Sequence, residues 1–287
     1  MKNFITIIIA LLVLPAIGFS QEKAKDTVVK EKLERPAFES SYIIDNPTDV
    51  VLRKNAMEVQ FAHRFGIIDW DNPEDLAGIY GPQANMRMGI AYGVVDRVTL
   101  GIGYTKLKRP LDLNWKVAIL RQTRSDKMPI NLTYFGNMAY SAQDQDKSNP
   151  RYNNQSDRLS YFHQLIISRR FTPAFSLQVA PSISHFNTVE DVQRNDMVAI
   201  AVGGRIKVTS GTSILVDYSQ PLTKFYQKNP HPGISLGVEF GTSAHAFQLF
   251  ITNYNKILPQ SNYMFNENDF FSGDILLGFN ITRIYNF

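Results

Sequence analysis

Five histidines are the side chains best suited to acid–base chemistry in this 287-residue chain. Nucleophilic catalysis needs a serine within hydrogen-bond reach of a histidine, which in a sheet means a neighbouring strand with the same facing. The predicted neighbours of His63, His163 and His185 place no serine on those faces. His231 and His245 fall in or near predicted connections. We therefore expect structural histidines and no enzyme.

Metal and cofactor ligands are also scarce in the sequence. The chain contains no cysteine, which excludes thiolate metal sites, disulfides and a lipid-attachment cysteine. One acidic cluster offers oxygen ligands for calcium but lacks the spacing and turn glycine of an EF-hand loop. Its members are Asp69, Asp71, Glu74 and Asp75. A solvated acidic loop is the simpler interpretation, and neither a phosphate-binding glycine loop nor a histidine metal pattern is present. We expect no cofactor and no metal.

Aromatic residues gather in two predicted outer loops, where they could bind a ligand by stacking or fold the loop onto its support. The set is Trp70 and Tyr80 in the first loop, and Tyr263, Phe265, Phe270 and Phe271 in the last. The second interpretation is the commoner outcome for such residues. We expect these side chains to pack against the rim of the fold.

Charged side chains recur at alternate positions within apolar segments, as in Leu113-Asn114-Trp115-Lys116. In an extended strand, alternate residues face opposite sides. The charged members of one side are Glu58, Arg64, Arg87, Asp112, Lys116, Arg205, Lys207, Asp217, Glu239 and Asp274. Five are basic and five acidic, so pairing into a cross-bracing network is favoured over selection of ions by sign.

The same alternation extends from about Asn55 to Phe287 in segments of roughly ten residues, and it is clearest over residues 175–184. Such segments predict the strands of a transmembrane β-barrel, with apolar side chains toward lipid and polar ones toward a lumen. Twelve strands are expected to begin near Asn55, Ala84, Val98, Leu111, Ile130, Arg158, Phe175, Met197, Thr212, Gly233, His245 and Ser272. The connections between them alternate short and long, as bacterial barrels require of their periplasmic and outer sides. An even strand number places both termini in the periplasm.

Alternation also predicts the lipid-facing sets, such as Met86, Met88, Ile90 and Tyr92. Aromatic residues collect near the predicted strand ends and indicate two interfacial girdles. The sixth strand is ambiguous, because Phe162 and Ile166 share a face with Gln164. Its existence is better defined than its facing.

The lumen of such a barrel is intermediate in width. Eight strands are filled by their own side chains, whereas sixteen to eighteen leave an aqueous channel. With twelve strands and balanced charges, the sequence favours a paired, largely occluded lumen and keeps a solute pore as the alternative.

The N-terminal part of the chain has three predicted sections. Lys2, the apolar residues 4–15 and the small residues before Gln21 predict a signal peptide over residues 1–20, cleaved between Ser20 and Gln21. Residues 21–36 are highly charged and predict a flexible periplasmic leader. Residues 37–54 surround the turn formers Asn46-Pro47 and predict either a segment paired beside the first strand or a plug.

The formal net charge is +4 at pH 7 and falls to +3 when Lys2 leaves with the signal peptide. This value is too small to indicate nucleic acid or another polyanionic partner.

Three segments resemble a known family. They are residues 58–66 (Glu-Val-Gln-Phe-Ala-His-Arg-Phe-Gly), residues 85–97 with the Tyr-Gly-x-x-Asp-Arg hairpin, and residues 116–123. They are similar to an uncharacterised membrane-bound β-barrel family of Gram-negative outer membranes, and the resemblance extends over residues 35–287. It implies an outer-membrane barrel and supplies no catalytic residues. The alternating Phe279, Ile281, Tyr285 and Phe287 also resemble the C-terminal signal read by the barrel-assembly machinery, with Tyr285 and Phe287 as its assembly-signal residues.

The sequence thus predicts an all-β, antiparallel, up-and-down outer-membrane barrel over residues 55–287. Its expected role is passage of a small solute or anchoring of a periplasmic or surface protein partner, with outer-membrane lipid and the assembly machinery as further partners. An outer-membrane enzyme of the phospholipase type and a secreted soluble β-sandwich are the alternatives.

Overall fold

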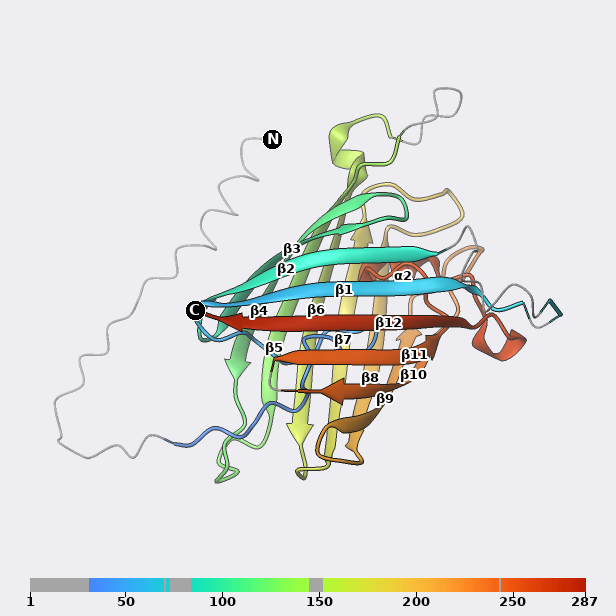
Figure 1. Ribbon diagram of the computed structural model, residues 1–287. Coiled ribbons are helices and arrows are strands. Elements are labelled where there is room, and N and C mark those ends of the chain that lie inside the picture. The colour runs from blue at the N-terminus through green and yellow to red at the C-terminus, as the bar shows by residue number, and fades with distance from the viewer. Residues whose placement is uncertain (1–30, 70, 73–83, 145–151, 243) are drawn as a thin grey trace, which may run out of the picture. The chain divides into compact units, whose positions relative to one another are not determined.

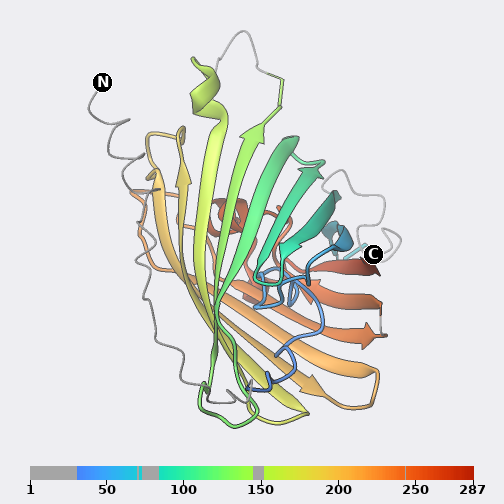
Figure 2. The ribbon, with the colours of Figure 1, turned by 90° about the vertical axis from the view of Figure 1, so that its left-hand side faces the viewer.

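Twelve antiparallel strands form one closed barrel in the computed structural model, which describes residues 31–69, 71–72, 84–144, 152–242 and 244–287. Each strand pairs with the next along the chain, and β12 pairs with β1 to close the ring (Figure 1, Figure 2). The strands are β1 Ala56–Ile67, β2 Asn85–Val95, β3 Val98–Thr105, β4 Pro110–Leu120, β5 Asn131–Ser141, β6 Leu159–Arg170, β7 Phe175–Phe186, β8 Asp196–Lys207, β9 Thr212–Pro221, β10 Gly233–Gly241, β11 His245–Thr252 and β12 Leu276–Asn286. The prediction of a twelve-stranded antiparallel barrel is confirmed, and the soluble β-sandwich is excluded.

Eleven of the twelve strands begin within one residue of the predicted position. The last begins at Leu276 instead of Ser272, because the short helix η3 Phe270–Ser272 precedes it. Gly273 follows this helix with φ of 93°, a left-handed conformation that favours glycine. The alternation of residues 272–275 therefore belongs to a turn and not to the strand.

The two ends of the barrel carry different connections. We call the terminal end the one where β1 begins and β12 ends, since Ala56 pairs with Asn286. Most connections there are short, such as residues 171–174 and 208–211. At the opposite end, which we call the loop end, most are long, and the longest described one is residues 253–275 with helix α2 Pro259–Phe265. Only residues 106–109 form a short connection at the loop end.

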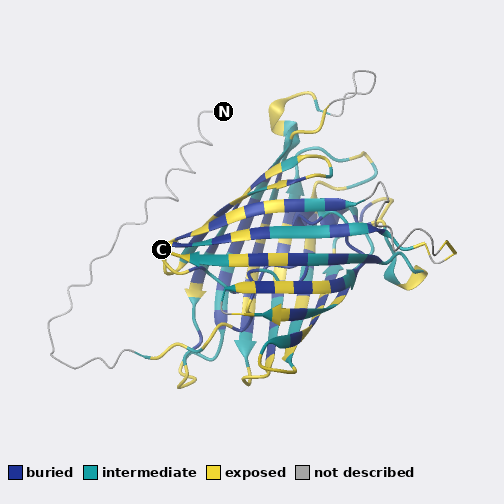
Figure 3. Ribbon diagram, viewed as in Figure 1, coloured by how far each residue is buried: buried dark blue, intermediate teal, exposed yellow. Residues whose placement is uncertain are grey.

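Side chains alternate between an exposed apolar outer face and a buried polar inner face along most strands (Figure 3). Ile102 on the outer face is 62% exposed, whereas Arg64 on the inner face is 1% exposed. This arrangement is the reverse of a soluble protein and is the one that a bilayer requires. No helix among the described residues is long and apolar enough to cross a membrane.

The inner face of β6 departs from the polar pattern. Phe162 and Ile166 point inward and are fully buried, whereas His163, Leu165 and Ile167 point outward. The inward pair packs with Tyr263 and Met264 of α2 in one apolar cluster. The ambiguity of this strand in the sequence therefore has a physical cause, since its lumen face supports an inserted helix and not water.

Candidate functional site: the occupied lumen

Residues 37–54, here called the plug segment, run inside the barrel (Figure 2). The segment folds back on itself at Asn46-Pro47, where Ile43 N–H donates to the Asn46 carbonyl at 2.9 Å and Thr48 N–H donates to the Ser41 carbonyl at 3.0 Å. Both hydrogen bonds lie within the loop. Residues 37–54 therefore form a loop within the lumen, and Leu52 packs with Ala56 at the start of β1.

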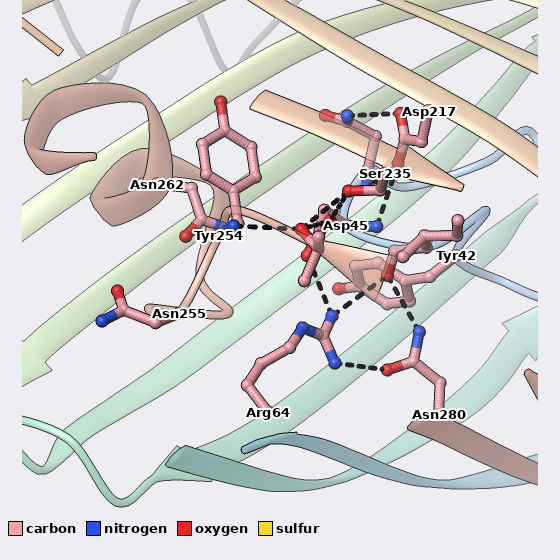
Figure 4. A network of polar contacts seen from close by, with 12 residues as sticks. Tyr42, Asp45, Arg64, Asp217, Ser235, Tyr254, Asn255, Asn262 and Asn280 are labelled. Atoms are coloured by element: carbon pink, nitrogen blue, oxygen red, sulfur yellow. Dashed lines mark hydrogen bonds and ion pairs between the residues drawn. The ribbon is translucent and has the colours of Figure 1, made fainter. Parts of the chain in front are cut away.

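Asp45, at the tip of the loop, is held by three strands. Its carboxylate forms an ion pair with Arg64 of β1 at 2.9 Å. It also accepts hydrogen bonds from the hydroxyls of Ser235 at 2.6 Å and Thr252 at 3.1 Å (Figure 4). Arg64 and Asp45 are both almost fully buried, and a buried charge is tolerated only when paired and hydrogen-bonded.

Asp217 of β9 binds the tip from the other side. Its carboxylate accepts the backbone N–H groups of Asp45 and Asn46, each at 2.9 Å, and the Asn46 amide at 2.7 Å (Figure 4). Asn280 of β12 donates to the Ile44 carbonyl at 2.9 Å. Residues distant in sequence thus converge on three consecutive residues of the plug segment, Ile44 to Asn46.

The two arms of the loop are bound by other wall residues. The Lys116 ammonium donates to the carbonyls of Ser41, Thr48 and Val50 at 2.6, 3.0 and 3.3 Å. Glu58 accepts a hydrogen bond from the Ser41 hydroxyl at 2.5 Å. An ammonium has three donors, and Lys116 uses them on backbone carbonyls of the loop. The contact therefore fixes the path of the backbone in addition to placing a charge beside it.

The base of the loop is fixed by an ion-pair cluster at the terminal end. Arg205 of β8 contacts Glu39 of the plug segment at 2.9 Å and Glu239 of β10 at 3.2 Å. Arg170 contacts Glu34 at 3.2 Å. Glu39 is half-exposed here, so solvent reaches this cluster more readily than the tip.

Glycines in the wall allow the close approach of the plug. A side chain at Gly203 would place its Cβ 2.8 Å from the Ile43 Cδ1, so this position lets Ile43 lie against the strand. At Gly103 a Cβ would lie 2.2 Å from the Arg87 guanidinium, which itself pairs with Asp112 at 2.7 Å. Atoms of Ile43 and Arg87 thus fill the space that a side chain would occupy at these two glycines.

A second insertion occupies part of the lumen near the loop end. Helix α2 begins with Pro259 at its first turn and buries Tyr263 and Met264 in the lumen. Gln260 donates to Asn137 of β5 at 2.7 Å, and the Tyr263 hydroxyl donates to Asn46 of the plug segment. The two insertions therefore touch inside the barrel.

Little space remains between them. A cavity of about 30 Å³ lies beside Tyr42, Asp45 and Arg64, and another of about 30 Å³ lies beside Asp49. Each has room for one or two water molecules. Several buried polar atoms near the plug have no protein partner, among them Asp49 Oδ1 and Gln178 Oε1. A larger cavity of about 360 Å³, lined by residues such as Phe38 and Leu52, opens at the terminal end.

Eight of the ten predicted lumen charges are buried in the wall: Glu58, Arg64, Arg87, Asp112, Lys116, Arg205, Asp217 and Glu239. Arg87–Asp112 and Arg205–Glu239 are the wall-to-wall ion pairs found among the described residues. Most of the remaining wall charges bind the plug segment. The lumen is therefore braced mainly through an inserted loop, which the alternation of the strands does not predict.

The residues that sequence reasoning missed are therefore on the plug segment: Glu39, Asp45, Asn46 and Asp49. The turn formers Asn46-Pro47 were the available signal.

Lys207 and Asp274 do not belong to this set. Lys207 is half-exposed at the end of β8. Asp274 lies in the turn before β12, where its carboxylate accepts the Asp269 N–H at 2.9 Å. The prediction of Asp274 as a lumen residue was wrong, because a residue in a turn does not follow strand alternation. Lys207 keeps the facing of Arg205, since it pairs with the buried Ser213, but it lies at the end of the strand.

The other predicted sites lie as follows. Tyr285 is on β12 opposite Met57, and Phe287 is 81% exposed after the strand. In the last loop Tyr263 is buried, whereas Phe271 is 86% exposed. Asp69 and Asp71 are exposed, but Trp70, Glu74, Asp75 and Tyr80 lie outside the described residues, as does the predicted signal peptide.

The histidines contact no serine hydroxyl in the part of the chain that the structure describes. His63 stacks on Phe279 at 5.3 Å between ring centroids. His163 shares a hydrogen bond with the Tyr134 hydroxyl at 2.7 Å, and His185 lies 2.7 Å from Asp196. No group of three or more potential metal ligands occurs among these residues.

Comparisons with known proteins give a family match and several solved structures of similar fold. No curated protein matches it. Among solved structures, a NanC porin has 7% identity and a TM-score of 0.48, covering 80% of this chain and 99% of the porin. An outer membrane channel from Pseudomonas putida F1 has 8% identity and a TM-score of 0.49, covering 82% of this chain and 97% of the channel. A KdgM porin has 5% identity and a TM-score of 0.47, covering 81% and 99%.

The family comparison is more extensive. The profile of one family matches residues 38–285, which includes all twelve strands almost completely and nearly the entire plug segment. The chain belongs to the family described as membrane bound beta barrel domain (DUF5777).

Proposed function

We propose that this protein is a non-enzymatic outer-membrane channel for small polar solutes, closed at rest by the plug segment and opened when that segment leaves the lumen. The observation that carries the proposal is the chemistry of the plug–wall interface. At the loop tip, Asp45 and Asn46 are held by one ion pair with Arg64 and by hydrogen bonds with strand residues. Once the loop leaves, the same wall groups can bind water, so the open state exposes a polar lining.

The direction of release follows from the covalent attachment of the loop. The plug segment continues into β1 at the terminal end, where the cavity of about 360 Å³ lies. Short connections gather at this end and long ones at the other, which is the pattern of bacterial barrels with periplasmic termini. In the proposal the signal peptide is cleaved between Ser20 and Gln21, and the plug leaves toward the periplasm.

The class of solute follows from the lining. The buried wall charges divide into four acidic and four basic residues: Glu58, Asp112, Asp217 and Glu239 against Arg64, Arg87, Lys116 and Arg205. A narrow passage with balanced charges favours small neutral or zwitterionic solutes and gives weak preference for either ion sign.

Planar-bilayer recordings test the proposal. The purified, refolded wild-type chain is expected to show small or no steady conductance. Asp45→Ala with Asn46→Ala removes the carboxylate that pairs with Arg64 and the side-chain amide that donates to Asp217. The buried Arg64 charge is then left without its ion-pair partner unless water enters. We expect this variant to open in discrete steps with weak ion selectivity. The control Asp126→Ala removes a half-exposed pair with Arg169 at 2.9 Å and should stay closed.

Large steady openings of the wild type would refute the occluded lumen. A tip variant that folds but remains as silent as the control would refute the gate and favour the second candidate, a membrane anchor for a periplasmic or surface protein.

The anchor is favoured by the terminal-end cavity, which could receive a segment of a partner beside Phe38 and Leu52. Photo-crosslinking from Arg53, which is exposed there, should then capture a discrete partner in intact cells. Capture of the barrel alone would leave the anchor without support.

A phospholipase role has no support in the contacts of the histidines. His63 on the outer face is surrounded by Phe61, Phe65 and Phe279, so no nucleophile lies beside it. Release of fatty acid by the purified chain from phospholipid micelles would contradict the non-enzymatic part of the proposal.

A further inference from the structure

A groove of about 620 Å³ lies on the outer face of the barrel, over strands β1 to β5. Outward apolar side chains line it, and they include Val59, Met88, Ile90, Ile102, Leu113 and Met138. Ile102 and Met88 are 62% and 55% exposed, so neither is covered by another part of the described chain. In a membrane-bound barrel this face meets the hydrocarbon of the bilayer.

The loop end of the groove is bordered by one row of residues across three strands. Tyr104 pairs with Leu111, and Leu111 pairs with Tyr140. All three line the groove. Tyrosines at a strand end typically sit at the interface between hydrocarbon and headgroups.

Three cationic residues follow immediately beyond this row. Lys106 comes two residues after Tyr104, Arg109 comes two residues before Leu111, and Arg158 precedes the residue that pairs with Tyr140. The Arg158 guanidinium lies over the Tyr140 ring at 6.0 Å. An apolar groove therefore ends in an aromatic row and then in positive charge.

The cations are available to a ligand at the interface. Lys106 is exposed, and its ammonium donates to the Ala84 carbonyl at 3.2 Å and forms no ion pair with an acidic side chain of the described residues. Arg109 pairs with Asp144 at 2.8 Å, but both side chains are mostly exposed, and such pairs are weak. Lys108 and Arg109 have φ of 59° and 48°, an unfavourable region for residues with side chains. The short hairpin thus keeps two cations where glycine or asparagine would suit the backbone better.

We propose that this groove binds one acyl chain of an anionic phospholipid, whose phosphate contacts Lys106 and Arg109. The apolar lining and the position on the bilayer face select an acyl chain over a soluble ligand. The adjacent positive charge selects an anionic headgroup over a zwitterionic one, because basic residues near a membrane surface attract anionic lipid. The inference depends on the membrane location of the barrel and is independent of whether the lumen opens.

Native mass spectrometry of the full chain, released from non-ionic detergent containing phosphatidylglycerol or phosphatidylcholine, tests the proposal. The wild type is expected to retain one phosphatidylglycerol, with a preference of at least about tenfold over phosphatidylcholine. The double variant Lys106→Gln and Arg109→Gln should lose that preference. Ile102→Trp, which fills the groove without changing charge, should lose the bound lipid.

Matched variants on the other side of the barrel control for general effects. Lys224→Gln with Lys228→Gln removes two exposed lysines at the same end, and Ile214→Trp adds the same bulk to an outward position of β9. Both should retain phosphatidylglycerol as the wild type does, and all variants should keep the heat-dependent gel shift of a folded barrel. The proposal would be overturned if the wild type retained the two lipids equally or if the control variants also lost phosphatidylglycerol. It would also be overturned if the wild type formed a dimer that Ile102→Trp abolishes.

Discussion

At the scale of single residues, the plug is held by charges that would be costly to bury alone. Asp45 and Arg64 satisfy one another, and the hydroxyls of Ser235 and Thr252 complete the coordination of the carboxylate. Removing one member of such a pair is more damaging than replacing both, because the remaining charge stays desolvated. The tip is therefore the point where a single substitution should change the state of the lumen.

Among the buried acidic residues, Asp49 has the least complete hydrogen bonding. One of its carboxylate oxygens has no hydrogen-bond partner, and burial raises the pKa of the Asp49 carboxyl above its ordinary value of 3.8. Because the folded-state pKa is raised, the neutral form is preferred in the seated plug. The contribution of the Asp49 carboxyl to the free energy of unfolding is then fully present below about pH 4. It is lost as the pH rises through the raised pKa.

We therefore expect Asp49→Asn to stabilise the protein at pH 7 by about 1–3 kcal/mol, because the neutral amide avoids the cost of burying a carboxylate charge. The measurement is the free energy of unfolding in detergent micelles at pH 4 and pH 7. The difference between wild type and variant should shrink toward the acid side. The exposed substitution Asp126→Asn serves as control, and an Asp49→Asn variant with the same stability difference at both pH values would contradict the assignment.

The residue scale also marks the limit of prediction from sequence. Strand parity identified Glu58, Lys116 and Asp217 as inward-facing, because a strand fixes the direction of each side chain. It could not identify Asp45 as the partner of Arg64, because the plug segment has no regular period. Pairing between a loop and a wall depends on a three-dimensional path that local spacing does not encode.

At the scale of elements, helix α2 and strand β6 depend on one another. Phe162 lies 5.6 Å from Tyr263 and 6.0 Å from Phe135 between ring centroids, in the part of the lumen that is apolar. A short helix of seven residues is not stable by itself in water, so its position comes from this packing.

Phe162→Ala should remove about 3–5 kcal/mol of packing at this contact. The expected result is release of the residues 253–275 connection while the barrel stays folded. Limited proteolysis should then cut that connection faster than in the wild type. Leu165→Ala on the outward face of the same strand is the control, and equal protection of the connection in Phe162→Ala and wild type would contradict the role given to β6.

The elements themselves were largely predictable, and the exceptions are instructive. Strands such as β3 and β7 began at the predicted residue because alternation and turn residues agree there. The strand β12 began later than predicted because a helical turn intervened. The facing of β6 stayed open because apolar side chains occupy both of its faces, and only the presence of α2 distinguishes the two.

At the scale of the whole molecule, the exposed apolar face requires a bilayer or detergent. Most of the large side chains exposed on the strands are aliphatic or aromatic, whereas most side chains buried on the inner face are polar or charged. The mature chain should therefore aggregate when detergent is removed and fractionate with the outer membrane after cell lysis. A monodisperse mature chain in plain buffer, as judged by size-exclusion chromatography with light scattering, would contradict the arrangement of faces.

Departure of the plug segment from the lumen is the step that converts the closed barrel into a conducting one. Because the chain has no cysteine, Ile43→Cys and Gly203→Cys can be added as a unique pair, and these positions lie close enough for a short thiol cross-link. The most direct measurement is the single-channel conductance of a chain that combines this pair with Asp45→Ala and Asn46→Ala. We expect discrete channels under reducing conditions and their loss when the two cysteines are cross-linked. Equal conductance before and after cross-linking, or none in either state from a folded barrel, would contradict it.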